Sequence, residues 1–284
     1  MNRLSRDKQI EVTKCLCEGM SISATVRMTG VAMNTVLKLL VDLGDACEAY
    51  HDEHVRNLHS KRIQCDELWA FVSKKDRVCT PGELATVGVG SVWTWTAIDA
   101  DSKLCVSYLV GGRDGEYAYA IMQDVAARVK NRIQLTTDAH GAYFTAVRQA
   151  FAGTGIDYAM LIKKYGKGQG NTSDVRYSPG ECIGIEKKKI SGNPNPDHIS
   201  TSFVERQNLN MRMNNRRFTR LTNAFSKKMA NLQASVALYF MHYNFVRIHQ
   251  TLRCSPAMEA GVTKHLWEIG DIVDLLDGRD LTVE

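Results

Sequence analysis

The sequence predicts a mixed α/β core that follows a smaller all-α unit, and three observations carry this prediction. Residues 5–40 show apolar side chains at helical spacing, with serines where helices would begin. From residue 61 onward, segments rich in β-branched and aromatic residues replace that pattern. Beyond residue 110, short apolar segments alternate with helical ones, which is typical of an α/β layer. A length of 284 residues fits about two domains.

The N-terminal unit is predicted to contain three short helices. Ser5 can cap the first of them, and Ser21 can cap a second over residues 22–28. After a glycine-containing turn, the apolar spacing predicts a third helix over residues 32–40. The polar residues 42–61 then predict a further helix or a linker.

Within this unit, a small apolar residue, a turn glycine and a second apolar residue have the spacing of a helix-turn-helix. The third helix would then enter the major groove of DNA, where Asn and Thr read base edges and Lys contacts phosphate. The side chains in reach would be Asn34, Thr35 and Lys38. A plain three-helix bundle is the alternative, because residues 1–59 hold seven Lys or Arg and eight Asp or Glu.

The core is predicted to follow the order β-β-β-α-β-α-β. Strands are expected over residues 62–73, 86–98, 103–110, 133–137 and 156–162, and helices over residues 115–130 and 140–151. This order is that of an RNase H-like fold, a mixed five-stranded sheet flanked by helices. We therefore divide the chain into a helix-turn-helix domain with its linker (1–60), a catalytic domain (61–255) and an acidic C-terminal tail (256–284).

Three carboxylates stand where this order would make them converge. Asp66 lies in the middle of the first, otherwise apolar strand, Asp138 ends the fourth strand beside it, and Glu205 opens a long helix. An isolated buried charge is costly, and binding of a divalent cation would explain the charge in the strand. Two such ions can clamp the attacking and leaving oxygens of a phosphodiester.

Each acid also has a structural explanation. Asp138 could cap the helix that begins near His140, and Asp66 or Glu67 could pair with an arginine. His140 is a candidate neighbour of the site, although capping or packing would explain it equally well.

Positive charge is concentrated around the third acid. Residues 203–228 hold seven basic residues and one acid, a pattern that favours a polyanion. On a helix, Asn208 and Arg212 would share the face of Glu205 and lie beside the scissile phosphate. Arg216, Arg217 and Arg220 are the candidates for holding the DNA strand, with a solvated helix face as the alternative.

At CDELW, TTDAHGAY and SFVERQN the sequence resembles a DDE transposase. More narrowly, it resembles the insertion-sequence-one family of bacteria, especially the longer single-frame members. The resemblance includes SISATVRMTGVAMNTVLKLL near the N-terminus and HYNFVRIHQTLRCSPAMEAGVT near the C-terminus, and so covers nearly the whole chain. Within the second of these segments, Arg247 and His249 are candidates for positions near the site or for backbone hydrogen bonds.

The resemblance implies an activity, a cofactor and a partner. Asp66, Asp138 and Glu205 would form the catalytic triad and bind two Mg²⁺ (or Mn²⁺) ions. The enzyme would bind double-stranded DNA at terminal inverted repeats, act as an endonuclease at the element's ends and join them to target DNA. Because two ends must react, we expect at least a dimer on DNA.

Two departures from the family are apparent. No cysteine spacing fits the family's N-terminal zinc finger, so we expect no zinc. Sixty-six residues separate Asp138 from Glu205, which is long for the family, so residues 163–200 read as an insertion. Its Gly, Lys and Pro content suggests a loop with short strands, and its role, in DNA contact, subunit contact or neither, is open.

Other function classes receive less support. The polar N-terminus lacks a signal-peptide core, and the longest uncharged run, residues 229–246, is too short and polar for a membrane span. We therefore expect a cytoplasmic, nucleoid-associated protein with reduced cysteines and no membrane partner. The alternatives to a transposase are a non-catalytic DNA-binding regulator, such as a domesticated remnant, and a nuclease without joining activity.

Overall fold

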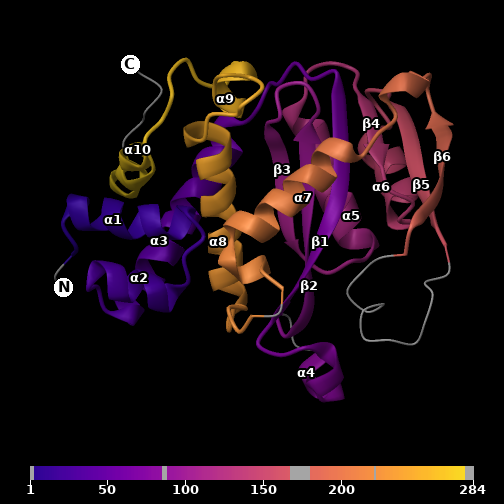
Figure 1. Cartoon of the computed structure of the whole chain (residues 1–284). Helices are drawn as coiled ribbons and strands as arrows, with labels where there is room; N and C mark the ends of the chain where they lie inside the picture. The colour runs from indigo at the N-terminus through magenta and orange to yellow at the C-terminus, as the bar shows by residue number, and fades with distance from the viewer. Residues whose placement is uncertain (1–2, 85–87, 167–179, 221, 279–284) are drawn as a thin grey trace.

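The computed structural model describes residues 3–84, 88–166, 180–220 and 222–278. Three N-terminal helices pack against one end of an α/β core, and two short C-terminal helices return toward them (Figure 1). The core contains one mixed sheet with helices on both of its faces (Figure 1). This arrangement confirms the expected α/β class and the expected series of helices in front of it.

The N-terminal helices are α1 (Arg6–Cys17), α2 (Ile22–Thr29) and α3 (Met33–His54). The two predicted serine caps are confirmed, since Ser5 Oγ accepts from Lys8 N at 3.4 Å and Ser21 Oγ from Ala24 N at 3.1 Å.

The predicted end of the third helix at residue 40 is wrong, because α3 continues for 14 further residues. Its buried residues Leu43, Cys47 and Tyr50 extend the stripe that begins at Val36 and Leu39. A stripe that keeps its spacing stays on one face, so packing carries the helix through residues that looked polar.

Six strands form the sheet, in the order β3-β2-β1-β4-β5-β6. They are β1 (Arg62–Val72), β2 (Gly90–Asp99), β3 (Cys105–Gly111), β4 (Gln134–Thr137), β5 (Asp157–Tyr165) and β6 (Cys182–Ser191). β4 and β5 run parallel to β1, whereas every other neighbouring pair is antiparallel.

The expected count of five strands is therefore wrong by one. The sixth, β6, lies in the predicted insertion, and its side chains are almost all exposed. It lacks the apolar alternation by which strands are recognised, and its pairing with β5 orders it. Residues 167–179 of that insertion lie outside the described residues.

Two helices cover each face of the sheet (Figure 1). They are α5 (Gly115–Arg128) and α6 (Ala142–Ala150) on one face, and α7 (Ser202–Asn214) and α8 (Met229–Met241) on the other. Alternate residues of β1 face the two cores: Ile63 and Cys65 belong to the larger cluster, and Leu68 to the smaller one with α7 and α8. Short elements are α4 (Pro81–Leu84), three single 3₁₀ turns of the core (Asp76–Val78, Pro196–His198, Arg216–Phe218) and a π-helical turn (His242–Val246).

α8 lies between the sheet and α3 and is buried on both sides. Its residues Val236 and Phe240 pack with the smaller cluster, while Ala237 and Leu238 pack with the larger one. α8 falls within the uncharged run of residues 229–246, and its burial on both sides accounts for the lack of charge there. No helix within the described ranges is both long enough and apolar enough to cross a membrane.

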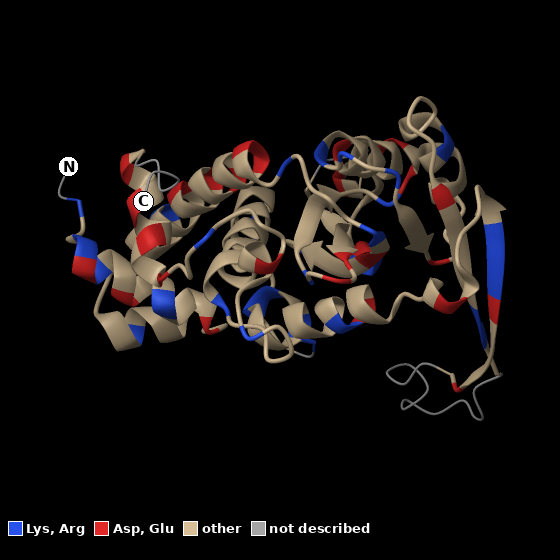
Figure 2. Ribbon diagram, turned by 90° about the horizontal axis from the view of Figure 1, so that it is seen from above, with Lys and Arg blue, Asp and Glu red and all other residues tan. Residues whose placement is uncertain are grey.

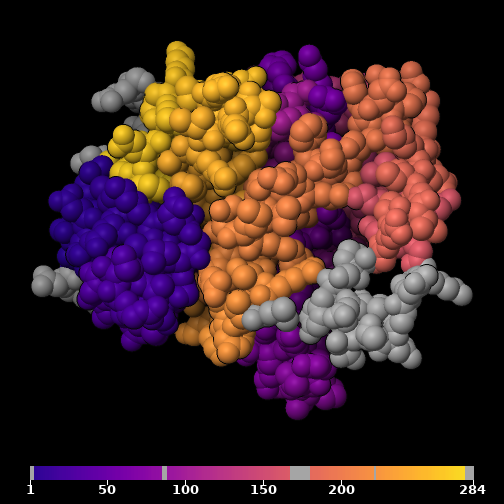
Figure 3. Space-filling model, viewed as in Figure 1, coloured from indigo at the N-terminus to yellow at the C-terminus, as the bar shows by residue number. Residues whose placement is uncertain are grey.

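The C-terminal segment packs onto the N-terminal helices (Figure 3). It contains α9 (Pro256–Glu259), α10 (Ile269–Asp274) and a final 3₁₀ turn (Leu275–Asp277). Two of its acids form ion pairs within the chain, Asp274 with Arg6 at 2.7 Å and Asp277 with Arg3 at 2.7 Å. The described part of the predicted acidic tail is therefore a packed segment.

Gly44 permits the close approach of α3 and α8. A Cβ added at this position would lie 2.4 Å from the Cα of Ala234, which is backbone and cannot move aside cheaply. Alanine normally gains about 1 kcal/mol over glycine inside a helix, and here overpacking by about 1–3 kcal/mol opposes that gain. We expect Gly44→Ala to lower the free energy of unfolding by up to about 2 kcal/mol, measured by urea denaturation.

The matched control is Gly115→Ala at the first residue of α5, where an added Cβ meets nothing within 4 Å. This variant should be as stable as the wild type or slightly more stable. A Gly44→Ala variant that gained stability would contradict the packing described for α3 and α8.

Candidate active site

The parallel pairing of β1 and β4 brings two of the predicted acids together. Cys65 pairs with Thr137 in the register, so the next residues along the two strands are Asp66 and Asp138. One carboxylate oxygen from each, with one from Glu67, form a group whose members all lie within 4.8 Å of one another. Oxygen ligands grouped in this way suit a hard divalent cation.

Asp66 carries the most perturbed carboxyl of the group. Its Oδ1 accepts from the backbone N of Glu67 at 2.8 Å, and its Oδ2 accepts from Asn208 Nδ2 at 2.9 Å. Burial raises the pKa of Asp66 from its ordinary value of 3.8 to about 7, and the neighbouring charge of Asp138 adds to the rise. An acid whose charged form is disfavoured by burial and by a neighbouring carboxylate indicates a place for a compensating cation.

Asp138 follows the last residue of β4. Its Oδ1 accepts from the backbone N of His140 at 2.9 Å, while α6 begins only at Ala142. The side chain therefore orders the turn before the helix and does not cap the helix itself. Its position beside Asp66 leaves it able to contribute to the acidic group.

Glu67 is a member of the acidic group that the sequence suggested only as a structural residue. Its buried carboxylate accepts from Arg113 Nε at 3.1 Å, which confirms the alternative that an acid of this strand pairs with an arginine. Burial raises the pKa of Glu67, against the lowering effects of Tyr143 and Arg113. No residue pattern separates Glu67 from Asp66; only the tertiary contact with Arg113 does.

Two hydrogen bonds from β1 fix the position of α7. Gln64 Oε1 accepts from the backbone N of Phe203 at 2.8 Å and of Val204 at 3.2 Å, which satisfies two free donors at the helix start. Two residues further along the same face, Asp66 binds Asn208 on the next turns of α7. The helix is thereby anchored against the acidic strand at two points, and the role of Gln64 was not predicted.

Glu205 lies on the anchored part of α7 but outside the closest acidic group. Lys163 Nζ of β5 donates to both of its carboxylate oxygens at 2.5 Å, and the Thr201 hydroxyl also donates to it. Its charge still reaches Asp66, whose pKa it helps to raise. The structure therefore brings Asp66 and Asp138 together and places Glu205 beside them, paired with a lysine that sequence reasoning missed.

The basic residues after Glu205 divide into two groups. Arg212 is half-buried near Asp66, and burial with the charge of Arg220 lowers its pKa to about 10. Arg216 lies beyond the helical face of Glu205, because α7 ends at Asn214 and the chain enters a 3₁₀ turn. There the Asn215 side chain accepts from Arg217 N and holds the turn.

The other predicted site residues lie apart from the acids. Asn34, Thr35 and Lys38 are exposed on the first turns of α3, with Lys38 ion-paired to Asp42. Arg247 and His249 follow the π-helical turn, and the neighbouring charges of His249 are those of Lys103 and Arg247. In the described residues, no hydrogen bond or ion pair joins these two to the acids.

His140 does lie beside the acidic group. Apart from its backbone contact to Asp138, its ring packs 5.8 Å from that of Trp95. Burial and the charge of Arg113 lower its pKa.

The donor set fits a divalent metal ion. Carboxylate oxygens of Asp66 and Asp138 are the hard ligands that Mg²⁺ and Mn²⁺ take. Asn208 Oδ1 is buried and has no hydrogen-bond partner among the described residues, so it is a further oxygen in need of a donor or cation. The arrangement is suited to metal-assisted attack on a phosphodiester.

The raised pKa of Asp66 predicts a stability effect. A carboxyl with a raised folded-state pKa binds its proton more tightly when folded, so the stability it contributes is lost as pH rises from about 4 to 7. A displacement from 3.8 to about 7 corresponds to roughly 4 kcal/mol. In EDTA at pH 8, Asp66→Asn should have a free energy of unfolding higher than that of the wild type by up to this amount, measured by urea denaturation. At pH 4 the variant should show no such advantage.

Asp101→Asn is the control of opposite sign. Asp101 pairs with Arg62, which lowers its pKa, so its loss should not stabilise the protein at pH 8. An Asp66→Asn variant whose stability advantage did not grow with pH would contradict the electrostatics of the acidic group.

Comparison with known proteins yields similar solved structures, two of which follow, and no family. Neither a family model nor a curated protein matches the chain. A pre-cleavage Mos1 transpososome matches with 13% identity and a TM-score of 0.23, over 56% of this chain and 60% of that one. A piggyBac transposase synaptic complex with hairpin DNA matches with 8% identity and a TM-score of 0.41, over 96% and 71%. The chain thus spans less than two thirds of the Mos1 chain, and its function has to be argued from its own residues.

Proposed function

We propose that the chain is a metal-dependent DNA transposase of the DDE type, with Asp66, Asp138 and Glu205 as its triad. The observation that carries the proposal is the meeting of Asp66 and Asp138 on neighbouring parallel strands, with α7 anchored across them. The RNase H-like reading of the core and membership of an insertion-sequence-one-like group belong to the same proposal.

Asp66, Asp138 and Glu205 would hold two Mg²⁺ or Mn²⁺ ions, with Glu67 as a further oxygen donor nearby. The ions would supply activation of the attacking oxygen and stabilisation of the leaving one. The chain itself orients Asp66 through Asn208 and keeps the acids partly shielded from solvent, which strengthens their electrostatic effect. A bound cation would displace the Lys163 ammonium group from the Glu205 carboxylate.

DNA would be held by basic residues from separate parts of the chain. Arg212 lies in the last turn of α7, and Arg216 and Arg220 follow the end of that helix. β6 carries a run of lysines along the sheet edge (Figure 2). Asn34, Thr35 and Lys38 are accessible on α3 and would read terminal repeats in a helix-turn-helix. Action on two DNA ends requires at least a dimer.

One observation favours a second candidate, a DNA-binding regulator without catalysis. Glu205 is fully engaged by Lys163 and Thr201, so the third acid already has a structural role. In this case the chain would bind DNA ends, and the acids would support only the fold.

A strand-transfer assay tests the proposal. Duplexes carrying the two ends of the element that encodes the chain are mixed with supercoiled target DNA, in Mg²⁺ or in EDTA. We expect metal-dependent joined products, which Asp138→Asn or Glu205→Gln should reduce at least about a hundredfold, because each removes charge stabilisation of the reacting phosphate. The products are resolved on a denaturing gel.

Asp101→Asn is the matched control, since it removes the same charge from a hairpin turn of the core and should leave joining unchanged. Cleaved ends without joined products would identify a nuclease. Specific end binding without any cleavage would contradict the transposase and favour the regulator.

Metal binding is expected without any DNA. At pH 8, Mg²⁺ should raise the midpoint of thermal unfolding of the wild type, because a ligand that binds only the folded state stabilises it. Asp138→Asn should abolish this increase, and Lys163→Gln should retain or enlarge it, since the lysine competes for Glu205. An equal Mg²⁺ response in wild type and Asp138→Asn would place the bound ion elsewhere.

A further inference from the structure

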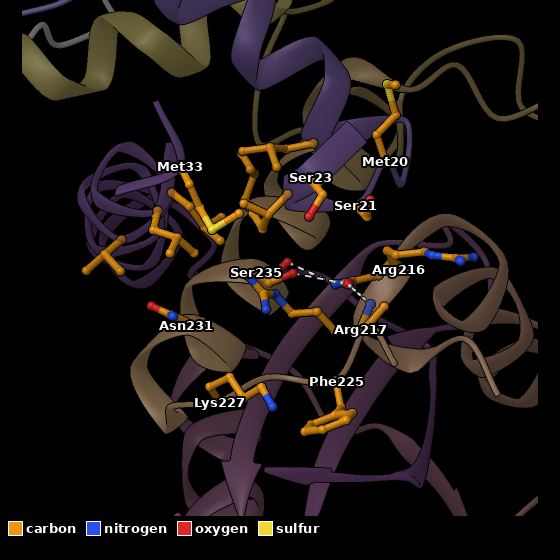
Figure 4. A pocket seen from close by; sticks show the side chains of 18 of the residues that line it. Met20, Ser21, Ser23, Met33, Arg216, Arg217, Phe225, Lys227, Asn231 and Ser235 are labelled. Carbon is orange, nitrogen blue, oxygen red and sulfur yellow. Dashed lines mark hydrogen bonds between the residues drawn. The ribbon is translucent and has the colours of Figure 1, made fainter. Parts of the chain in front are cut away.

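A cavity of about 930 Å³ lies at the other end of α7 from Glu205. One wall comes from the N-terminal helices, including Met20, Ser21 and Met33, and the other from the segment that runs from Arg216 to α8 (Figure 4). Its volume is that of a site for a small organic ligand. The helix rise places it about 14 Å along α7 from Glu205, so it is distinct from the acidic group.

The cavity is positively charged. The basic side chains that line it are Lys38, Arg216, Arg217, Lys227 and Lys228. Among the described lining residues, Asp42 is the one acid, and its charge is taken by Lys38. None of the other four cations forms an ion pair within the described part of the chain. Such an imbalance favours an anionic ligand.

Arg217 is the focus of this charge. Its Nη1 donates to Ser226 Oγ at 3.0 Å, while its Nη2 is buried and has no hydrogen-bond partner among the described residues. Burial alone lowers its pKa to about 10. A guanidinium that is desolvated and has no acid beside it is costly, and a phosphate oxygen would supply the acceptor that Nη2 lacks.

The wall around Arg217 is held rigidly. Asn215 Oδ1 accepts from Arg217 N at 3.2 Å and from Ser235 Oγ at 3.0 Å, and its Nδ2 donates to the Ser235 carbonyl at 3.1 Å (Figure 4). These bonds tie the 3₁₀ turn to α8. The guanidinium is therefore carried on a fixed backbone, as a binding site requires.

The rest of the cavity can accept an aromatic body. Met20 and Met33 lie on the N-terminal side, and Leu37 joins them from α3. Met33 is 48% exposed, so its side chain is accessible to a ligand in the cavity. Methionine makes favourable contacts with aromatic rings. Asn34 and Asn231 supply amides that can bind the edge of a base.

We propose that this cavity binds a single nucleotide, with the phosphate on Arg217 and the base between the methionines and the asparagines. The nucleotide is either a free nucleoside monophosphate or one unpaired nucleotide of a DNA strand. A site of this kind would join the N-terminal helices to the core through one ligand. It does not depend on the acids, so it stands or falls separately from the proposed transposase activity.

The test uses the full chain in EDTA, where no cleavage can occur. The first probe is 2-aminopurine deoxyriboside 5′-monophosphate, and the second is a DNA duplex with one unpaired 2-aminopurine nucleotide. Its fluorescence falls when the base is enclosed between side chains. The comparison probes are the nucleoside without phosphate and a duplex in which the same base is paired.

We expect quenching of at least one phosphate-bearing probe, with binding weakened about tenfold or more in Arg217→Gln, because a charged hydrogen-bonded contact is lost. Quenching of the monophosphate identifies a free nucleotide, and quenching of the unpaired duplex alone identifies a strand. Lys228→Gln, at an exposed position of the same cavity, should also weaken binding.

Arg148→Gln is the matched control, since it removes the same charge from the exposed face of α6. Thermal unfolding checks that Arg217→Gln folds, and removal of an unpaired buried cation should not destabilise it. The proposal is overturned if neither probe is quenched, or if Arg217→Gln and Arg148→Gln bind equally well.

Discussion

The parallel pairing of β1 with β4 is the constraint on which the candidate site depends. It sets Asp66 and Asp138 side by side, although 71 residues separate them in the chain. Burial, with the charge of Asp138 adding to it, raises the pKa of Asp66 to about 7. Within the described residues, no ion pair offsets the cost of charging Asp66. A bound cation can therefore stabilise this site.

Helix α7 connects this pair of strands to the basic segment that follows it. Gln64 accepts a hydrogen bond from the first turn of the helix, and Asn208 of the helix donates one to Asp66. Beyond its C-terminal end, the chain enters the 3₁₀ turn that contains Arg217. The acidic group and the basic cavity are therefore built at the two ends of one helix. α8 and α3 then fix the cavity's walls, because Gly44 allows the two helices to approach closely.

Residue pattern predicted the elements better than their contacts. Caps at Ser5 and Ser21 and the β-β-β-α-β-α-β order were found from local signals, because capping and alternation are local physics. The pairing of β6 into the main sheet and the full length of α3 had no such signal. Their extent is decided by pairing with β5 and by a buried stripe that meets α8.

The sequence by itself determined which residues carry charge into apolar surroundings, and so pointed to Asp66, Asp138 and the basic segment around residue 217. Only the tertiary structure decided what those charges meet. Among the described residues, it gave Glu67 an arginine, Glu205 a lysine and Arg217 no acid, because such partners come from segments tens of residues apart. Burial and pairing depend on those long-range contacts, and residue spacing carries no record of them.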